Sequence, residues 1–422
     1  MVDGENFISP SQSPSNYVCS NSPGVPSRFR MLLINYLSSL RLSGEFMSEI
    51  VVTAAPYCFG PTSKALCIAS ELARLHQITY VGAQPGISLA RAANCCPVIE
   101  LTDRDQWSGP ALNALLRSRC LISALESRAI LVASKHGIPV VFFDTLLWLR
   151  PTPPPHFDLA SVYVAQSFFR RPTESVLKAL KAFEGVGAVF SQNLDALHAR
   201  GASAPGIRLL VNFGGLTSPA MLPAADIDYV TWILRVLQMT GLPSSRLTVC
   251  LPIQLSRLIP VALHYLPDAN IRTPTLDEFH ALLSDCSVLI TIPGLETVLE
   301  AMYLGRPIIF LPPHNATQAI QLRVYRENGV GWCVPASSLE LALDGCCSDL
   351  HEATRVVQGL NKKNLSDVGT TARIAQHLCE HSHHLMTNTD CAEVVVADNT
   401  TLLHALGTNG RESVADIVRS LV

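Results

Sequence analysis

The sequence predicts an α/β protein with two Rossmann-like domains, each a doubly wound parallel sheet, that face each other across a cleft. From residue 50 onward, short β-branched runs alternate with longer amphipathic stretches, the pattern of a parallel sheet covered by helices on both faces. The alternation restarts after the Gly/Pro/Ala segment at 201–206. With 422 residues, 48% of them hydrophobic and 15% charged, the chain is too long for one core and apolar enough for two.

The first domain is predicted to span 47–204. Its expected strands are 50–54, 79–82, 138–143 and 188–190, and the apolar spacing of 63–75 predicts a helix after the first strand. Residues 1–46 are expected to form a disordered or weakly packed leader. Their first 27 residues are crowded with Ser, Pro and Asn and have no apolar periodicity.

The second domain is predicted to span 205–422. The pattern predicts strands at 208–212, 247–251, 288–292 and 307–311, with helices at 276–284, 296–303 and 317–328. Open parallel sheets bind ligands beyond the carboxyl ends of their strands, so two such sheets would enclose a ligand between them.

Charge and cysteine content exclude several classes of protein. A formal net charge of −3 gives no general attraction to nucleic acid or to an anionic membrane. No apolar run reaches the roughly 18 to 20 residues of a membrane-spanning helix. Thirteen cysteines without a repeated CxxC spacing favour a reduced, cytoplasmic setting over a disulfide scaffold or a zinc ribbon. The oligomeric state is left open.

The stretch 289–334 carries the most chemical information. A buried strand ends in a Pro-Gly turn at Gly294, and a helix then opens whose free N–H groups form a ready anion site. Thr297 lies in its first turn, and Glu300 lies where a carboxylate could accept hydrogen bonds from ribose hydroxyls. Gln318 stands near the start of the next helix, where its amide could bind sugar hydroxyls. The alternative without a ligand site is an ordinary βαβ crossover with a surface Glu and Gln.

This stretch resembles the nucleotide-sugar motif of GT-B glycosyltransferases, both the UDP-glycosyltransferases and the lipid-linked GlcNAc transferase of cell-wall synthesis. The matching residues are Gly294, Thr297, Glu300-Ala301, Gly305-Arg306-Pro307, the strand ending at Leu311, and Pro313 followed by Gln318. The resemblance implies that Gly294 and Thr297 line the pyrophosphate, Glu300 holds the ribose and Gln318 the sugar. It also implies that the domain at 205–422 binds the nucleotide sugar and the domain at 47–204 binds the acceptor. Ile292-Pro293 replaces the family's His-Gly, and Thr317 replaces the Asp before the sugar-binding Gln.

Two further turns are predicted to meet the substrates. Gly214-Gly215 follows the first strand of the second domain, where paired glycines let the backbone approach the donor; an ordinary Gly turn is the alternative. The loop at 54–64 occupies the place of the GT-B acceptor loop and contributes Tyr57 and Gly60. Ser63 in that loop is either a ligand contact or a helix N-cap. The catalytic His common in this loop of the family is absent.

Asp144 is the candidate general base, because it ends the strongest strand of the first domain beside an aromatic residue. The alternative is that it caps the following turn. The segments around Trp148 and Phe168 resemble the acceptor half of cytosylglucuronate synthases from nucleoside-antibiotic pathways. That resemblance implies a UDP-glucuronate donor and a pyrimidine acceptor, with Trp148 or Phe168 available for stacking.

Together these patterns predict a glycosyltransferase that moves a sugar from a UDP-sugar to a small acceptor by an inverting displacement. No cofactor and no metal are expected beyond the UDP-sugar co-substrate, because the Asp pairs at 103/105 and 226/228 follow no clean strand. Two rivals remain: a nucleotide-sugar epimerase or hydrolase on the same architecture, and a non-catalytic sugar-nucleotide-binding partner of another transferase.

Overall fold

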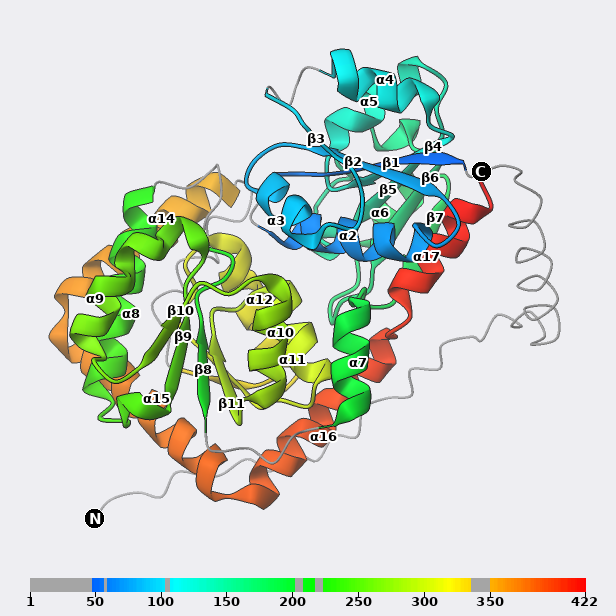
Figure 1. Ribbon diagram of the computed structural model, residues 1–422. Coiled ribbons are helices and arrows are strands. Elements are labelled where there is room, and N and C mark those ends of the chain that lie inside the picture. Colours follow the sequence, from blue (N-terminus) through cyan, green and yellow to red (C-terminus); the bar gives the residue numbers. More distant parts are fainter. Residues whose placement is uncertain (1–47, 57–58, 103–106, 202–207, 217–222, 335–349) are drawn as a thin grey trace. The chain divides into compact units, whose positions relative to one another are not determined.

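The computed structural model describes residues 48–422 except 57–58, 103–106, 202–207, 217–222 and 335–349. The predicted leader at 1–46 therefore lies outside the described residues. The described chain contains two sheets, of seven and six strands, in which all strands are parallel. Helices flank each sheet (Figure 1). The predicted α/β class with two doubly wound sheets is confirmed.

The first sheet has the strand order β3-β2-β1-β4-β5-β6-β7. Its strands are β1 Glu49–Ala54, β2 Gln77–Gly82, β3 Val98–Glu100, β4 Cys120–Ala124, β5 Val140–Asp144, β6 Val162–Gln166 and β7 Phe183–Val186. The sheet interior is closed on both sides, since Ile50, Val51 and Val52 of the central β1 are all fully buried. A run of consecutive apolar residues is what such a two-sided strand requires.

Helices and short 3-10 turns connect these strands. They are α2 Gly60–Leu72, α3 Gly86–Ala93, α4 Gly109–Arg117, α5 Ser127–Lys135, η1 Leu147–Leu149, η2 Phe157–Leu159, α6 Glu174–Ala179 and α7 Gln192–Arg200. The predicted helix after β1 thus exists but starts three residues earlier, at Gly60, with Pro61 in its first turn. Proline fits there because a first-turn N–H has no helical partner.

The strand predicted at 188–190 is wrong. The sheet's last strand is Phe183–Val186, and Ala188 instead pairs with the far end of the chain. Its N–H donates to the Gly407 carbonyl at 2.8 Å, and its carbonyl accepts from the Gly410 N–H at 3.1 Å. A distant segment has therefore taken the hydrogen bonds that a neighbouring strand would make.

The second sheet has the strand order β10-β9-β8-β11-β12-β13. Its strands are β8 Leu209–Asn212, β9 Leu247–Cys250, β10 Asn270–Arg272, β11 Val288–Thr291, β12 Ile308–Phe310 and β13 Trp332–Cys333. The four strands predicted for this half are all present, each within two residues of its predicted ends. Their carboxyl ends lie at one edge, as in any parallel sheet.

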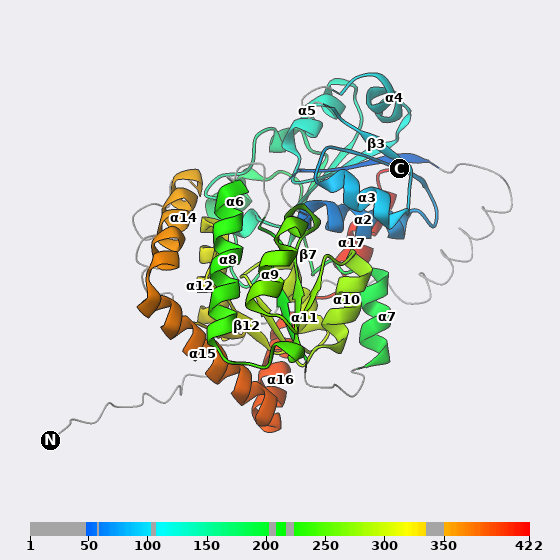
Figure 2. The ribbon, with the colours of Figure 1, turned by 60° about the vertical axis from the view of Figure 1, so that its left-hand side comes forward.

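The helices of this part include a long C-terminal series. They are α8 Pro223–Met239, η3 Ser244–Arg246, η4 Ile253–Leu258, α9 Ile259–Tyr265, α10 Leu276–Asp285, α11 Leu295–Tyr303, α12 Ala316–Glu327, α14 Leu350–Ser366, α15 Val368–Thr387, α16 Thr389–Leu406 and α17 Gly410–Arg419. Figure 2 shows α14 and α15 alongside α8. The buried Trp232 of α8 donates its indole N–H to Thr371 of α15 at 3.1 Å, which ties these helices together.

After the helices of the second sheet, the chain returns to the first sheet, where the last described helix, α17, packs. Val414, Ala415 and Val418 are fully buried in the same core as β1 and α2. The chain can make this return only because glycines meet at the crossing. A Cβ on Gly410 would lie 2.1 Å from the Gly187 carbonyl oxygen. The predicted boundary between the two domains, at 204/205, stays a prediction. By its packing, α17 belongs to the first sheet, although it lies in the second half of the chain.

Within the described ranges, no helix combines the length and apolar character needed to cross a membrane.

Candidate functional site

A pocket of about 1130 Å³ lies beyond the carboxyl ends of strands from both sheets. Its walls are the segments that follow β1, β2, β4 and β5 of the first sheet and β8 to β12 of the second, together with part of α14. All six residues predicted to bind the donor line it: Gly214, Gly215, Gly294, Thr297, Glu300 and Gln318. Gly60, predicted for the acceptor, lines it as well, whereas Tyr57 lies outside the described residues.

The N-terminus of α11 forms one wall of the pocket. Gly294 is the N-cap and offers no side chain, so the first-turn N–H groups are left for a ligand. The Gly294 carbonyl accepts a hydrogen bond at 3.0 Å from the hydroxyl of the buried Tyr325. This contact fixes the turn that presents the helix end to the pocket.

Asn212 joins the two predicted phosphate-binding turns. Its side-chain oxygen accepts from the Gly214 N–H at 3.0 Å, and its amide nitrogen donates to the Thr297 hydroxyl at 3.4 Å. Asn212 is 5% exposed, so one buried amide holds both turns in register. Asn212 is not among the site residues predicted from the sequence, because its bridging role depends on the pairing of β8 with β11.

Gln318 ties the glycine turn to the start of α12. Its side-chain nitrogen donates to the Gly215 carbonyl at 3.3 Å, and its oxygen accepts from the His314 N–H at 2.8 Å. Asn315 caps the helix by accepting from the Gln318 N–H at 2.9 Å. The Gln318 amide therefore connects two segments of the pocket wall, the glycine turn and the start of α12.

Gly215 has a φ of +82°, a backbone conformation that a side chain disfavours. We expect Gly215→Ala to lower the free energy of unfolding by about 1 to 3 kcal/mol, because the strain falls on a turn held by two hydrogen bonds. Equilibrium denaturation measures this. Gly359→Ala, in the middle of α14 with open space around the new methyl, is the control and should be neutral or slightly stabilising. Equal losses in both variants would contradict the strain argument.

Charged side chains from both sheets meet at the pocket: Glu296 and Glu300 line it, and the buried Lys64 and His280 lie beside them. Glu300 lies 3.3 Å from the His280 Nε2 of α10. Lys64 of α2 forms an ion pair with Glu296 of α11 and also donates to the Val189 carbonyl. Lys64 is 1% exposed, whereas Glu296 is 19% exposed and lines the pocket, so the pair is shielded from solvent on its Lys64 side.

Burial and charge act in opposite directions on two of these groups. Burial alone raises the pKa of Glu300, but His280 and then Lys64 outweigh it and hold the pKa below the ordinary value of 4.5. Burial lowers the pKa of Lys64, and the Glu300 charge offsets only part of that effect. Glu300 is therefore an ionised acceptor at neutral pH, as a ribose-binding carboxylate must be.

The N-terminus of α2 forms part of the opposite wall. Gly60, Pro61 and Ser63 line the pocket there. The N-cap of α2 is Phe59, and the Ser63 N–H donates to the Phe59 carbonyl at 2.8 Å, so Ser63 is not the helix cap that the sequence offered as an alternative.

Asp144 does not line the pocket. Its side chain is fully buried and accepts three hydrogen bonds: from the Leu146 N–H at 2.6 Å, from Arg150 Nε at 2.8 Å and from the Tyr163 hydroxyl at 2.5 Å. This is the geometry of the turn cap that the sequence offered as the alternative. The role of Asp144 as a general base stays a prediction, and the geometry does not favour it.

Trp148 and Phe168 do not line the pocket either. Both are more than nine-tenths buried, and their rings lie 4.3 Å apart in the core that also contains Tyr325. The Trp148 indole N–H is already used, since it donates to the Thr145 carbonyl at 3.1 Å. The described structure thus gives these aromatic residues a packing role, and stacking on an acceptor stays a prediction.

No group of three or more His, Cys, Asp or Glu side chains in the described part of the chain is arranged to hold a metal ion.

No protein-family model matches this chain, and no curated protein sequence matches it. The chain does match solved protein structures. The chain is similar to the glycotransferase of kitacinnamycin, at 15% identity over 89% of this chain and 99% of that one, with a TM-score of 0.53. It is similar to spinosyn rhamnosyltransferase at the same identity and coverage, with a TM-score of 0.51. At such low identity the likeness establishes the fold, which is GT-B.

Proposed function

We propose that this protein is a glycosyltransferase that transfers a sugar from a UDP-sugar to a small acceptor by an inverting displacement. The observation that carries the proposal is the single pocket that gathers Gly214, Gly294, Thr297, Glu300 and Gln318 beyond the strand ends of a GT-B fold. The structural neighbours named above are sugar-transferring enzymes by their descriptions, which supports the same class of reaction here.

The chain's own residues account for donor binding. The diphosphate lies at the N-terminus of α11, where backbone N–H groups and the Thr297 hydroxyl stabilise its charge. The Glu300 carboxylate accepts hydrogen bonds from the ribose hydroxyls, and Gln318 and the glycine turn contact the sugar. The acceptor enters from the α2 side, and its nucleophilic atom forms a bond to the anomeric carbon as the bond to the diphosphate oxygen breaks.

The specificity implied by the resemblance to cytosylglucuronate synthases is a finer proposal. It requires a UDP-glucuronate donor and a pyrimidine acceptor. The burial of Trp148 and Phe168 gives the pyrimidine no stacking surface from these two residues, so this part of the proposal rests on the sequence alone.

A thermal-shift panel of nucleotides and nucleotide sugars tests the proposal. A true donor at one hundred times its dissociation constant stabilises the folded chain by about 2.7 kcal/mol. We expect UDP and one UDP-sugar to stabilise it more than the ADP, GDP and thymidine counterparts. A panel in which no nucleotide shifts the transition would overturn the proposal. Consumption of the UDP-sugar without any acceptor would favour the epimerase or hydrolase.

Glu300→Gln tests the donor site directly. We expect UDP affinity to fall by about 1 to 3 kcal/mol, because a charge-assisted hydrogen bond to the ribose is replaced by a neutral one. Since the pKa of Glu300 lies below 4.5, the wild-type contribution should be unchanged between pH 7 and pH 5 and lost only at lower pH. Calorimetry measures both the affinity of the variant and the pH dependence of the wild type.

Glu380→Gln, on the exposed face of α15, is the control. Unchanged UDP affinity in folded Glu300→Gln would remove Glu300 from the site.

A further inference from the structure

The wall of the pocket contributed by the first sheet has an unusual chemical composition. We call it the acceptor wall and define it by Phe59, Pro61, Leu89, Leu125, Leu146 and Arg150, which all line the pocket. Apart from Arg150, the described pocket-lining residues from the first sheet and its connections are apolar or carry only a hydroxyl. Arg150 is therefore the one charged side chain that the described part of the first sheet and its connections present to the pocket.

Arg150 is held in one orientation. Its Nε donates to Asp144 Oδ2 at 2.8 Å, and that carboxylate is fixed in turn by the Tyr163 hydroxyl and the Leu146 N–H. Asp144 is fully buried, whereas the Arg150 side chain is 29% exposed. Among the described residues no partner is found for the two terminal nitrogens of the guanidinium. These nitrogens form the fork that matches a carboxylate.

Leu125 shows that the apolar part of the wall is built under strain. It has a φ of +61°, in the left-handed region that leucine rarely adopts, and it lies directly after β4. Its N–H donates to the Phe143 carbonyl at 2.9 Å, and the Ser123 hydroxyl donates to the Glu126 carbonyl at 2.6 Å, so the turn is fixed at both ends. Strain of this kind persists where the surroundings over-determine it, often at ligand sites.

We propose that the acceptor is an amphiphilic anion: Arg150 binds its carboxylate and the apolar residues of the acceptor wall hold its body. This inference rests on the proposed function and names the substrate class of the same site. Asp144 then acts as a positioning residue, because it keeps the guanidinium ordered before the acceptor arrives and so lowers the entropy lost on binding. The position of Arg150 on the first sheet assigns the anion to the acceptor and not to the donor sugar.

The test uses the full chain saturated with UDP and a panel of phenolic, alicyclic and long-chain hydroxy acids, each with its methyl ester, and cytosine as a neutral member. We expect the best acid to bind at least 10-fold more tightly than its ester. Arg150→Gln should weaken acid binding by about 10- to 100-fold, the effect of losing a charged bidentate partner, and leave ester and UDP binding unchanged.

Two further variants guard against misfolding. Arg150→Gln leaves the buried Asp144 without its cation, so the double variant Asp144→Asn with Arg150→Gln keeps a neutral hydrogen-bonded pair and should show the same loss of acid preference. Arg91→Gln removes an arginine paired with Glu100 at the same 2.8 Å distance but outside the pocket, and should bind acids normally.

Several results would overturn the inference. These are equal binding of acids and esters across the panel, tightest binding of cytosine, or an acid preference that survives in Arg150→Gln. A selective loss of UDP-glucuronate relative to UDP-glucose in Arg150→Gln would assign the anion to the donor sugar and overturn the acceptor assignment. UDP binding, measured separately, distinguishes these failures from failure of the proposed function.

Discussion

Replacement of Lys64 by methionine should lower the free energy of unfolding by about 3 to 5 kcal/mol, the usual cost of removing one partner from a buried ion pair. The Lys64 ammonium is 1% exposed and serves both Glu296 and the Val189 carbonyl. Methionine has a similar length but no charge and no donor, so the Glu296 carboxylate, only 19% exposed, would lose its cation. Urea denaturation followed by circular dichroism measures the loss.

Two control variants test whether the loss comes from the Lys64–Glu296 ion pair. Lys178→Met removes a lysine whose pair with Glu174 is 73% and 81% exposed, and should cost less than about 0.5 kcal/mol. The double variant Lys64→Met with Glu296→Gln should recover at least half of the loss, because no uncompensated charge remains. A Lys64→Met variant as stable as Lys178→Met would show that the buried pair contributes nothing.

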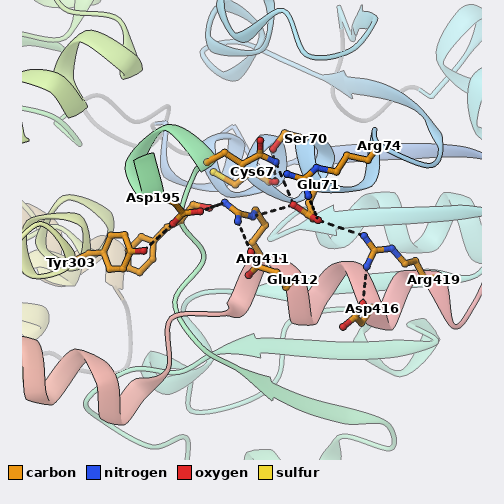
Figure 3. Close-up of polar contacts among 12 residues, drawn as sticks. Cys67, Ser70, Glu71, Arg74, Asp195, Tyr303, Arg411, Glu412, Asp416 and Arg419 are labelled. Carbon is orange, nitrogen blue, oxygen red and sulfur yellow. Dashed lines mark hydrogen bonds and ion pairs between the residues drawn. The ribbon is translucent and has the colours of Figure 1, made fainter. Parts of the chain in front are cut away.

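Arg411→Met should have an effect of similar size, about 3 to 5 kcal/mol. Figure 3 shows Arg411 at the centre of a network with Asp195, at 2.9 Å, Glu412, and Glu71, at 3.5 Å. Arg411 also donates to the Phe190 carbonyl at 3.0 Å. Its side chain is 9% exposed. Removing it detaches the start of α17 from α2 and α7, while Glu71 keeps Arg74 at 3.2 Å and Arg419 at 3.7 Å.

Arg419→Met is the matched control for Arg411. Arg419 lies on the same helix and also reaches Glu71, but at 3.7 Å and with 27% of its side chain exposed. We expect its loss to cost less than about 1 kcal/mol. If both variants unfold at the same denaturant concentration, the network does not hold α17 to the first sheet.

The donor side of the pocket could be predicted because its residues are close together in the chain. Between 288 and 328 the sequence contains a strand, a turn, a helix, a second strand and a second helix, and the fold brings the predicted Gly294, Thr297, Glu300 and Gln318 to one pocket. Local patterning fixes such a unit, since each element's period and its turn residues lie within a few residues of each other.

The remaining features could not be predicted because they depend on pairs far apart in the sequence. The partners Lys64 and Glu296 are separated by the whole first sheet, and no spacing rule connects them. The failure of the strand predicted at 188–190 has the same origin, because Gly407 and Gly410 occupy its hydrogen bonds. Asp144 follows a strong strand, as a catalytic residue would, but only the placement of Tyr163 and Arg150 reveals that its oxygens are occupied.

The return of α17 to the first sheet has a consequence for synthesis on the ribosome. Arg411 and the Phe190 carbonyl that it binds are 221 residues apart, so at about 5 to 20 residues per second the first sheet waits about 10 to 45 s for its last helix. During that interval the apolar surface later covered by Val414, Ala415 and Val418 is open to chaperones and to other nascent chains. The N-terminal core can therefore close only after α17 has been made.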